Sequence, residues 1–331
     1  MLFRILKYNA TAGYLLIPLL TVIAWWPSLS TDSWQQMAFD LQSMPLFELV
    51  RGYIPANSLV SNILAMAFLM VIGFYLINFN SRYIIISERT LLPTFFFILI
   101  ISSLPILQRM NPALLSMAFF LPAFNKLLSS YKTERLSYNF FEASFLIGAG
   151  SLLYFNLIYF IVLVWVALLI LRPVIWREWA FSILGVITPW AFFVTGYFLI
   201  HDTFAPALEL IKFDFALQDT FHLIDIPLQV YFSFLLLLLI PASSHIVRSI
   251  NKMKVLPRKI FVLFFWTFIL AAAIFFLIDT ANIEMIIHAA VPIAFLLSHY
   301  ILAIRSGFWR NLILWLMVAG LQVIAWLPVI S

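Results

Sequence analysis

An acidic residue directly after the first apolar segment has the type and position of a catalytic base. Asp32 lies in Thr31-Asp32-Ser33-Trp34, where a run of apolar residues ends. A carboxylate at the mouth of a cavity can take a proton from an acceptor hydroxyl, and ionisable groups near a membrane are costly to keep. An acid in the first turn of a helix is also favoured by the helix dipole. Asp32 is therefore predicted as a base, with a helix-start role as the structural alternative.

Two arginines are candidates for binding a phosphate. Arg51 and Arg109 both stand apart from the other cations of the chain, and a guanidinium can hold a phosphate by two parallel hydrogen bonds. The loop Gln108-Arg109-Met110-Asn111 is too short to float free between its two apolar neighbours. Either arginine could instead pair with a nearby acid or a lipid headgroup.

Glu284 and His288 are four residues apart, which places them on one face of a helix where carboxylate and imidazole can meet. Such a pair could transfer protons or contact a phosphate, and the alternative is a polar helix end that faces water. His201 and His222 flank a longer polar segment and are predicted only as the rim of a substrate site.

Several kinds of chemistry lose support. The chain has no cysteine, which removes disulfides and thiolate metal sites. It has no Walker A, GxSxG, HExxH or CxxC motif. A lone Glu–His pair has too few ligands for a metal, so no metal or other cofactor is predicted. The net charge of +5 is explained by membrane topology rather than by nucleic acid.

The composition requires a membrane around the chain. Hydrophobic residues make up 64% of the sequence and charged residues 10%, against about 25% charged residues in soluble domains. A spanning helix needs about 20 apolar residues. The sequence predicts an all-α, polytopic membrane helix bundle with about eleven transmembrane helices, at 10–28, 58–78, 90–106, 112–128, 139–153, 155–171, 179–200, 227–247, 259–279, 284–304 and 308–329.

Charge decides the one ambiguous stretch, 140–171, which is too long for one upright helix. Cations precede and follow it, so the chain must cross twice if both clusters are cytoplasmic, and the small residues at 148–151 favour a break. With two crossings there, sixteen lysines and arginines fall on one side and only Arg51, Arg109 and Lys212 on the other. The positive-inside rule then places the N-terminus in the cytoplasm.

Two segments on the outer side are too long to be simple connectors. In 30–57 and 201–226 apolar residues recur at helical spacing, which predicts helices lying in the membrane interface. No soluble domain or internal repeat is visible, so residues 1–331 are predicted to form a single integral membrane domain.

Several segments resemble an uncharacterised family of bacterial multi-span inner-membrane proteins across most of the chain. They are Ser87-Glu88-Arg89-Thr90-Leu91-Leu92-Pro93, Ala143-Ser144-Phe145-Leu146-Ile147-Gly148, Ser151-Leu152-Leu153-Tyr154-Phe155, and Arg172-Pro173 with Arg177-Glu178-Trp179, Gly185 and Pro189. The resemblance implies a bacterial inner membrane and brings no established activity.

The order of long outer loops and short fifth and sixth spans also resembles the GT-C superfamily, membrane glycosyltransferases that use polyprenyl-phosphate sugars. The resemblance implies that an acid of the first outer loop acts at the acceptor or at a metal, and by position this is Asp32 or Asp40. The chain departs from the pattern because this loop has no adjacent acidic pair and no Trp-Trp-Asp motif.

These features lead to one principal prediction of function and two alternatives. The principal one is a GT-C-like transferase that takes a sugar or similar group from an isoprenoid-phosphate carrier, with Asp32 or Asp40 as base and Arg51 and Arg109 on the phosphate. The alternatives are a non-catalytic subunit of a cell-envelope complex and a lipid or solute transporter. The expected partners are membrane lipids, the isoprenoid-phosphate carrier and, for the subunit, envelope proteins.

Overall fold

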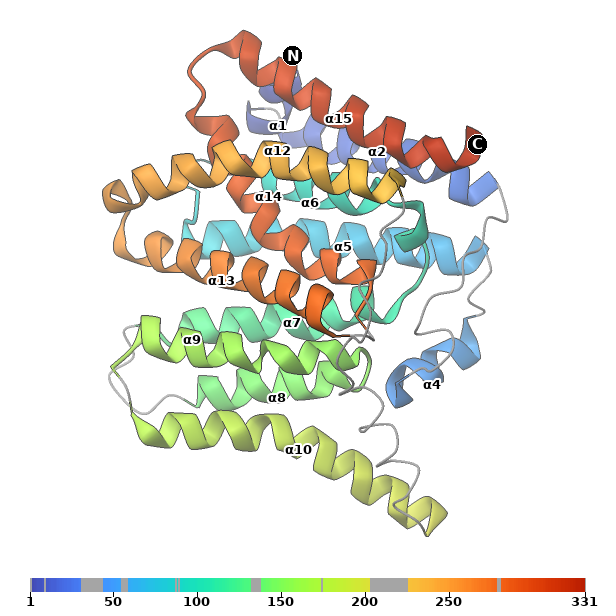
Figure 1. Cartoon of the computed structure of the whole chain (residues 1–331), viewed down its shortest axis with the longest axis vertical. Coiled ribbons are helices and arrows are strands. Elements are labelled where there is room, and N and C mark those ends of the chain that lie inside the picture. Colours follow the sequence, from blue (N-terminus) through green and yellow to red (C-terminus); the bar gives the residue numbers. More distant parts are fainter. Residues whose placement is uncertain are drawn as a thin grey trace.

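The structure is a computed structural model that describes residues 2–8, 10–30, 44–54, 59–86, 88, 90–131, 138–173, 175–202, 226–278 and 281–330. Within these ranges the regular elements are helices, and Figure 1 shows most of them running side by side. They are α1 (Leu2–Tyr8), α2 (Ala10–Ser30), α4 (Pro45–Tyr53), α5 (Leu59–Tyr83), α6 (Leu92–Ser102), η1 (Pro105–Leu107), α7 (Pro112–Ser129), α8 (Asn139–Ser151), η2 (Phe155–Phe160), α9 (Ile161–Leu171), α10 (Trp176–His201), α12 (Ile226–Ser249), η3 (Ile250–Lys252), α13 (Val255–Leu277), η4 (Ile283–Met285), α14 (Ile286–Ala303) and α15 (Gly307–Ile330).

Each segment predicted as a span coincides with a helix, and the ambiguous stretch is the predicted pair, α8 followed by η2 and α9. Among the described residues, six helices are long and apolar enough to cross a membrane, so the chain is a helical membrane protein. They are Leu59–Tyr83, Pro112–Ser129, Trp176–Ile200, Leu228–Lys252, Val255–Leu277 and Ile283–Ala303. That the other helices cross as well stays a prediction.

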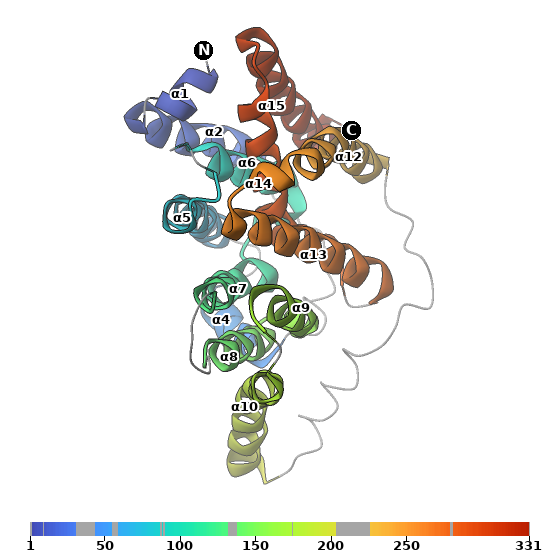
Figure 2. The ribbon, with the colours of Figure 1, turned by 90° about the vertical axis from the view of Figure 1, so that its left-hand side faces the viewer.

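The helices form a stack that is elongated across their axes. Viewed along the axes in Figure 2, α10 lies at one edge, α7, α8 and α9 follow, and α5 and α13 come next. Beyond them lie α6 and α14, and α2, α12 and α15 close the other edge (Figures 1 and 2). Glycines allow α8 and α10 to pack closely, because a Cβ on Gly148 of α8 would lie 2.6 Å from the Val186 carbonyl oxygen of α10.

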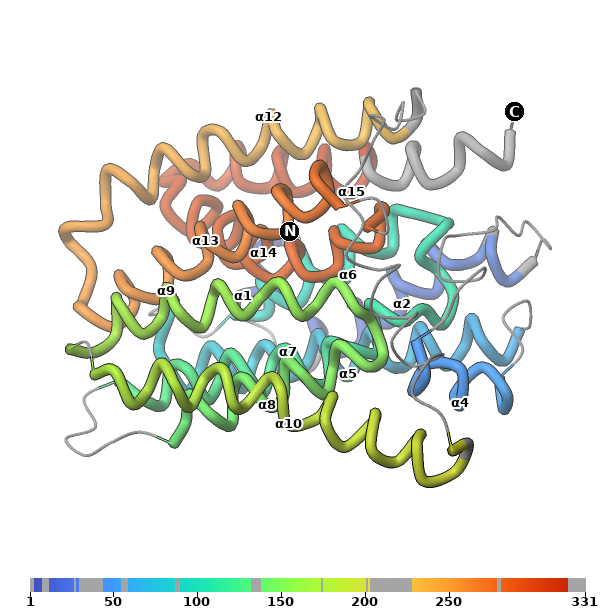
Figure 3. Tube along the Cα trace, turned by 60° about the horizontal axis from the view of Figure 1, so that its bottom comes forward, coloured from blue at the N-terminus to red at the C-terminus, as the bar shows by residue number. Residues whose placement is uncertain are grey.

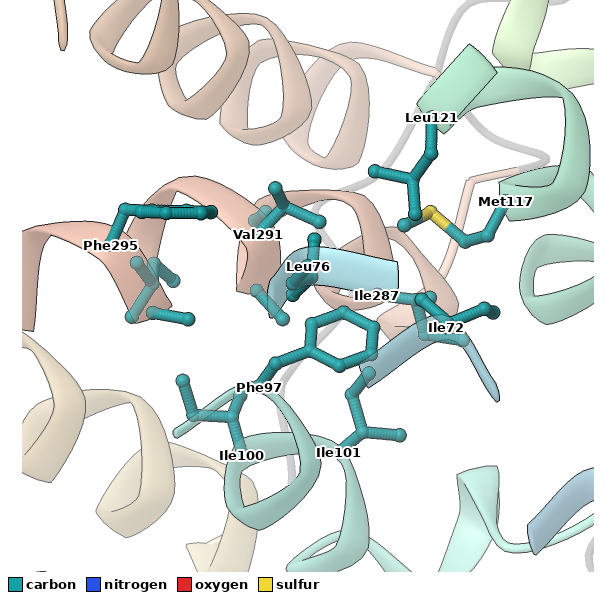
Figure 4. Close-up of a cluster of buried hydrophobic side chains, with 14 of the residues drawn as sticks. Ile72, Leu76, Phe97, Ile100, Ile101, Met117, Leu121, Ile287, Val291 and Phe295 are labelled. Carbon is teal, nitrogen blue, oxygen red and sulfur yellow. The ribbon is translucent and has the colours of Figure 1, made fainter. Parts of the chain in front are cut away.

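The core of the stack is α6, whose eleven residues are all buried. Figure 4 shows Phe97, Ile100 and Ile101 of α6 facing a cluster of apolar side chains from three neighbouring helices. This cluster contains Ile72 and Leu76 of α5, Met117 and Leu121 of α7, and Ile287, Val291 and Phe295 of α14. A helix enclosed in this way makes no contact with lipid along its length.

The two ends of the bundle differ in charge. The last turns of α5, α7 and α12 carry Arg82, Lys126 and Arg248, and η3 carries Lys252. These helix ends lie together on the left of Figure 1, and we call this the basic end. The opposite end holds η1, η2, η4 and α4 (Figures 1 and 3).

Candidate functional site

Three interruptions of helical backbone lie at the end opposite the basic end, which we call the break end. The first follows α6, whose eleven residues span about 16 Å. The hydrocarbon core of a bilayer is about 30 Å thick, so α6 ends well before a full crossing. The chain then leaves the α-helix for the segment 103–111, which contains the short 3₁₀ helix η1 and in which Ser103, Leu107, Gln108 and Asn111 are buried. Irregular backbone at membrane depth is stable only where protein or a water-filled cavity surrounds it.

The other two interruptions are shorter. The turn Leu152–Tyr154 joins α8 to η2, and the segment from Ala281 to η4 leads into α14. Tyr154, Asn156 and Glu284 belong to these two interruptions and are buried. Because all three interruptions lie at one end of the bundle, each brings a buried polar or charged side chain there.

Hydrogen bonds fix the first interruption. The Gln108 side-chain amide donates to the carbonyl oxygens of Ala24 (3.2 Å) and Ser102 (2.6 Å), and its own oxygen accepts from Ser28. Asn111 caps α7 by accepting from the Leu114 N–H at 2.8 Å. These bonds hold Arg109, which lies between the two residues and is 7% exposed, in a defined place.

Glu284 occupies the centre of the candidate site. Its side chain is 1% exposed, and its Oε1 accepts a long hydrogen bond from the Tyr154 hydroxyl (3.4 Å) and one from the Asn282 N–H (3.3 Å). Its Oε2 has no hydrogen-bond partner among the described residues. Arg109 lies close enough for an electrostatic interaction with this carboxyl group. The site therefore combines a buried cation with a buried acid that keeps one oxygen open.

His288 lies one turn into α14 and is fully buried. Its Nε2 is 3.0 Å from the Ser116 hydroxyl oxygen, and that hydroxyl lies 2.8 Å from the Ala113 carbonyl, its other acceptor. A serine hydroxyl has one proton, so when it donates to Ala113 the Nε2–H of His288 is the donor to Ser116. The Tyr154 ring stacks on the imidazole, with centroids 5.8 Å apart and planes at 11°. Tyr154 thus touches both His288 and Glu284.

This arrangement suits an anionic group better than a metal. Arg109 offers donors in a planar fork that matches a phosphate, and Glu284 offers a proton acceptor a short way off. No group of three histidine, cysteine, aspartate or glutamate residues able to hold a metal ion occurs among the residues that the structure describes.

Comparison with known proteins identifies a family. The sequence profile of DUF6427, a family of unknown function, matches residues 42–330. The chain belongs to this family. No curated protein and no solved structure matches the chain. The predicted resemblance to an uncharacterised family is thus confirmed, and no solved GT-C structure supports the second resemblance.

Of the eight site residues predicted from this DUF6427 sequence, three come together: Arg109, Glu284 and His288. The interpretation of Glu284 and His288 as a water-facing helix end is wrong, because both are buried. Their connection runs through Tyr154. Sequence reasoning missed Tyr154 and Ser116 as site residues.

The remaining predicted residues are placed differently. Arg51 is half-buried in the last turn of α4, a helix held beside the second interruption by the Leu46 N–H, which donates to the Leu152 carbonyl at 3.2 Å. His201 ends α10, and its side chain is not described. Asp32, Asp40 and His222 lie outside the described residues. Segment 30–57 thus contains one helix in its described part, α4.

A second buried acid lies at the far side of the molecule. The sequence suggests an interfacial ion pair within Trp176-Arg177-Glu178-Trp179, but the partner of Glu178 is Arg172, whose Nη1 lies 2.7 Å from Oε1. Both side chains are almost fully buried, at 4% and 0% exposure. The break before α10 folds Arg172 back onto the first turn of that helix, which spacing along one helix does not reveal.

Proposed function

We propose that this protein is a GT-C-like membrane transferase that takes a sugar or similar group from an isoprenoid-phosphate carrier at the outer face of a bacterial inner membrane. The observation that supports this most is that the break end holds a buried arginine, Arg109, and a buried acid, Glu284. Ionisable groups buried in a membrane protein usually serve a function. In this proposal Arg109 binds the phosphate of the carrier and Glu284 accepts a proton from the reacting hydroxyl.

The charge distribution supports the proposed topology. If the predicted eleven helices all cross, the basic end is cytoplasmic, as the positive-inside rule requires, and the N-terminus lies on the same side. The break end then faces outward. Sixteen of nineteen lysines and arginines fall on the cytoplasmic side in this arrangement. Arg109 is one of the three exceptions, and it is buried at the break end.

The proposed reaction transfers the group in one displacement. An acceptor hydroxyl oxygen attacks the anomeric carbon of the carrier-linked sugar, and the bond between that carbon and the phosphate oxygen breaks. The electron pair leaves with the phosphate, whose charge Arg109 stabilises. Glu284 takes the proton of the acceptor. Tyr154 is a positioning residue, because it holds Glu284 by its hydroxyl and is itself stacked on His288.

Asp32 and Asp40 stay alternative bases, since they follow α2 in the chain and Ser28, near the end of α2, bonds Gln108 at the break end. The three acids make different predictions. If Glu284 is the base, Glu284→Gln blocks transfer while Asp32→Asn and Asp40→Asn retain it. If an acid of the loop is the base, the pattern reverses, and the assignment to Glu284 is wrong while the transferase stands.

The test is native mass spectrometry with lipid extraction on the detergent-purified full chain. We expect the wild type to carry an isoprenoid phosphate or a lipid-linked sugar. Arg109→Gln should reduce its occupancy about 10- to 100-fold, because a hydrogen bond to a charged group contributes about 1.5–3 kcal/mol. Arg248→Gln, at the exposed basic end, is the matched control and should retain the lipid.

Two results would overturn the proposal. Bulk phospholipid alone in both the wild type and Arg109→Gln, together with a stoichiometric protein partner, would favour the envelope subunit. Vectorial movement of a lipid or solute in proteoliposomes, without change of its covalent structure, would favour the transporter.

A further inference from the structure

An apolar groove runs between α12, α13 and α14 in the half of the bundle next to the break end. It has a volume of about 200 Å³, and its lining is almost entirely apolar. Leu236 of α12 and Phe276 of α13 form exposed rims, whereas Ala271 and Ala289 lie buried at its floor. The groove therefore opens sideways, on a surface formed by spanning helices.

The groove and the candidate site share the short helix η4. Ile283 and Met285 line the groove, and Glu284, between them in the chain, accepts the bond from Tyr154 and interacts with Arg109. One turn of backbone thus joins an apolar slot to a buried polar site. A ligand that extends along this turn must have an apolar chain and a polar, anionic head.

We infer that the groove holds the isoprenoid chain of the carrier while its phosphate lies at Arg109, an assignment that rests on the proposed function. The groove is one slot that reaches η4, where Glu284 interacts with the buried Arg109. This arrangement matches a lipid with a single chain and a phosphate head. A phospholipid with two chains would leave one of them outside the groove.

Packing decides which chain is preferred. Lipid tails are as apolar as the groove wall, so a chain that moves from the bilayer into the groove gains contacts rather than hydrophobic free energy. An isoprenoid chain carries a methyl branch on every unit and needs more width than a straight acyl chain. The alanines at the floor, Ala271 and Ala289, leave that width where larger side chains would remove it.

The test measures binding of three phosphate probes to the full chain in phosphatidylcholine nanodiscs: farnesyl phosphate, dodecyl phosphate and inorganic phosphate. Ala272→Leu fills the groove from the half-buried wall of α13. The matched control is Ala273→Leu, on the next residue of α13, which is also half-buried but does not line the groove. Leu236→Trp narrows the groove from the exposed rim of α12 and does not depend on repacking the core.

We expect Ala272→Leu and Leu236→Trp to weaken farnesyl phosphate binding about tenfold, as overpacking by one to a few carbons does. Inorganic phosphate binding and the Ala273→Leu control should stay at the wild-type level. Equal farnesyl phosphate affinity in the wild type and both groove variants would overturn the inference, as would tighter binding of dodecyl phosphate than of farnesyl phosphate. Arg109→Gln should weaken all three probes. If Arg109→Gln weakens the binding of none of the probes while the groove variants still weaken farnesyl phosphate binding, the phosphate does not bind at Arg109, and the groove is still the site of the isoprenoid chain.

Discussion

Glu178 and Glu284 are both buried acids with an arginine nearby, yet their surroundings differ. Glu178 is paired with Arg172 at 2.7 Å, and both side chains are almost fully buried. Glu284 accepts only long hydrogen bonds on its Oε1, from the Tyr154 hydroxyl at 3.4 Å and from the Asn282 N–H at 3.3 Å.

The difference separates a structural acid from a functional one. Burying a charge is offset only by close pairing and full hydrogen bonding, and the Arg172–Glu178 pair has the close geometry that this requires. The hydrogen bonds to Glu284 are long, so they offset its burial less, which lowers stability in the free protein. Proteins keep such groups where a ligand supplies the missing contact, at the expense of stability. Substitution of Glu178 should therefore lower stability, whereas substitution of Glu284 should lower activity and change stability little.

The largest effect on stability is expected at the Arg172–Glu178 pair. Glu178→Ala leaves Arg172 buried without its acid and should lower the free energy of unfolding by about 3–5 kcal/mol. Thermal and denaturant unfolding of the purified protein would measure it. Replacing both residues, Arg172→Met with Glu178→Leu, should restore most of the loss, because no charge is then stranded. Stability of Glu178→Ala equal to the wild type would contradict the structural role.

A smaller effect on stability is expected at the contact between α8 and α10, the helix whose first turn contains Glu178. A Cβ on Gly185 of α10 would lie 2.5 Å from the Phe141 carbonyl oxygen of α8. Gly185→Ala should therefore cost about 1–3 kcal/mol of unfolding free energy through overpacking. The matched control is Gly52→Ala in α4 at the break end, where a Cβ meets no atom within 4 Å. If both variants unfold at the wild-type temperature, the α8–α10 contact is looser than its geometry indicates.

The smallest effect on stability is expected at Glu284. Glu284→Gln keeps the shape of the side chain and should change the free energy of unfolding by less than about 1 kcal/mol. Group transfer should fall by about 10²- to 10⁴-fold, the range for removal of a general base. The measurement is unfolding and turnover on the same preparation. A loss of stability comparable to that of Glu178→Ala would mean that Glu284 is structural too.

The helices were predictable from the sequence because lipid imposes a length and an apolar composition on every span. The pair formed by α8 with η2 and α9 required the charge argument as well, and its helices are as predicted. The end of α6 at Ser102 was not predicted, since the next residues, Ser103 to Leu107, are apolar enough to continue a helix. Hydropathy does not report where a buried helix stops.

The candidate site was predictable only in its separate members. Arg109 stood out because it is one of three cations predicted on the outer side of the membrane, and Glu284 and His288 stood out because they are four residues apart. These residues come together because three chain interruptions that are far apart in sequence lie at the same end of the bundle, and no local sequence pattern predicts such proximity. Tyr154 was hidden among many aromatic residues, and Ser116 among apolar residues of α7. The only signal for Tyr154 was its place at the turn between two short helices.

The complete burial of α6 also constrains how the protein is made. The shell around this helix includes α14, which is synthesised about 185 residues later and packs on it through Ile287 and Val291. During synthesis α6 therefore contacts lipid or other segments temporarily, and it reaches its final packing only after most of the chain has been inserted. Contacts between segments so distant in sequence form slowly and leave intermediates exposed to misassembly. Chains truncated before α14 should consequently be substrates for membrane quality control rather than stable fragments.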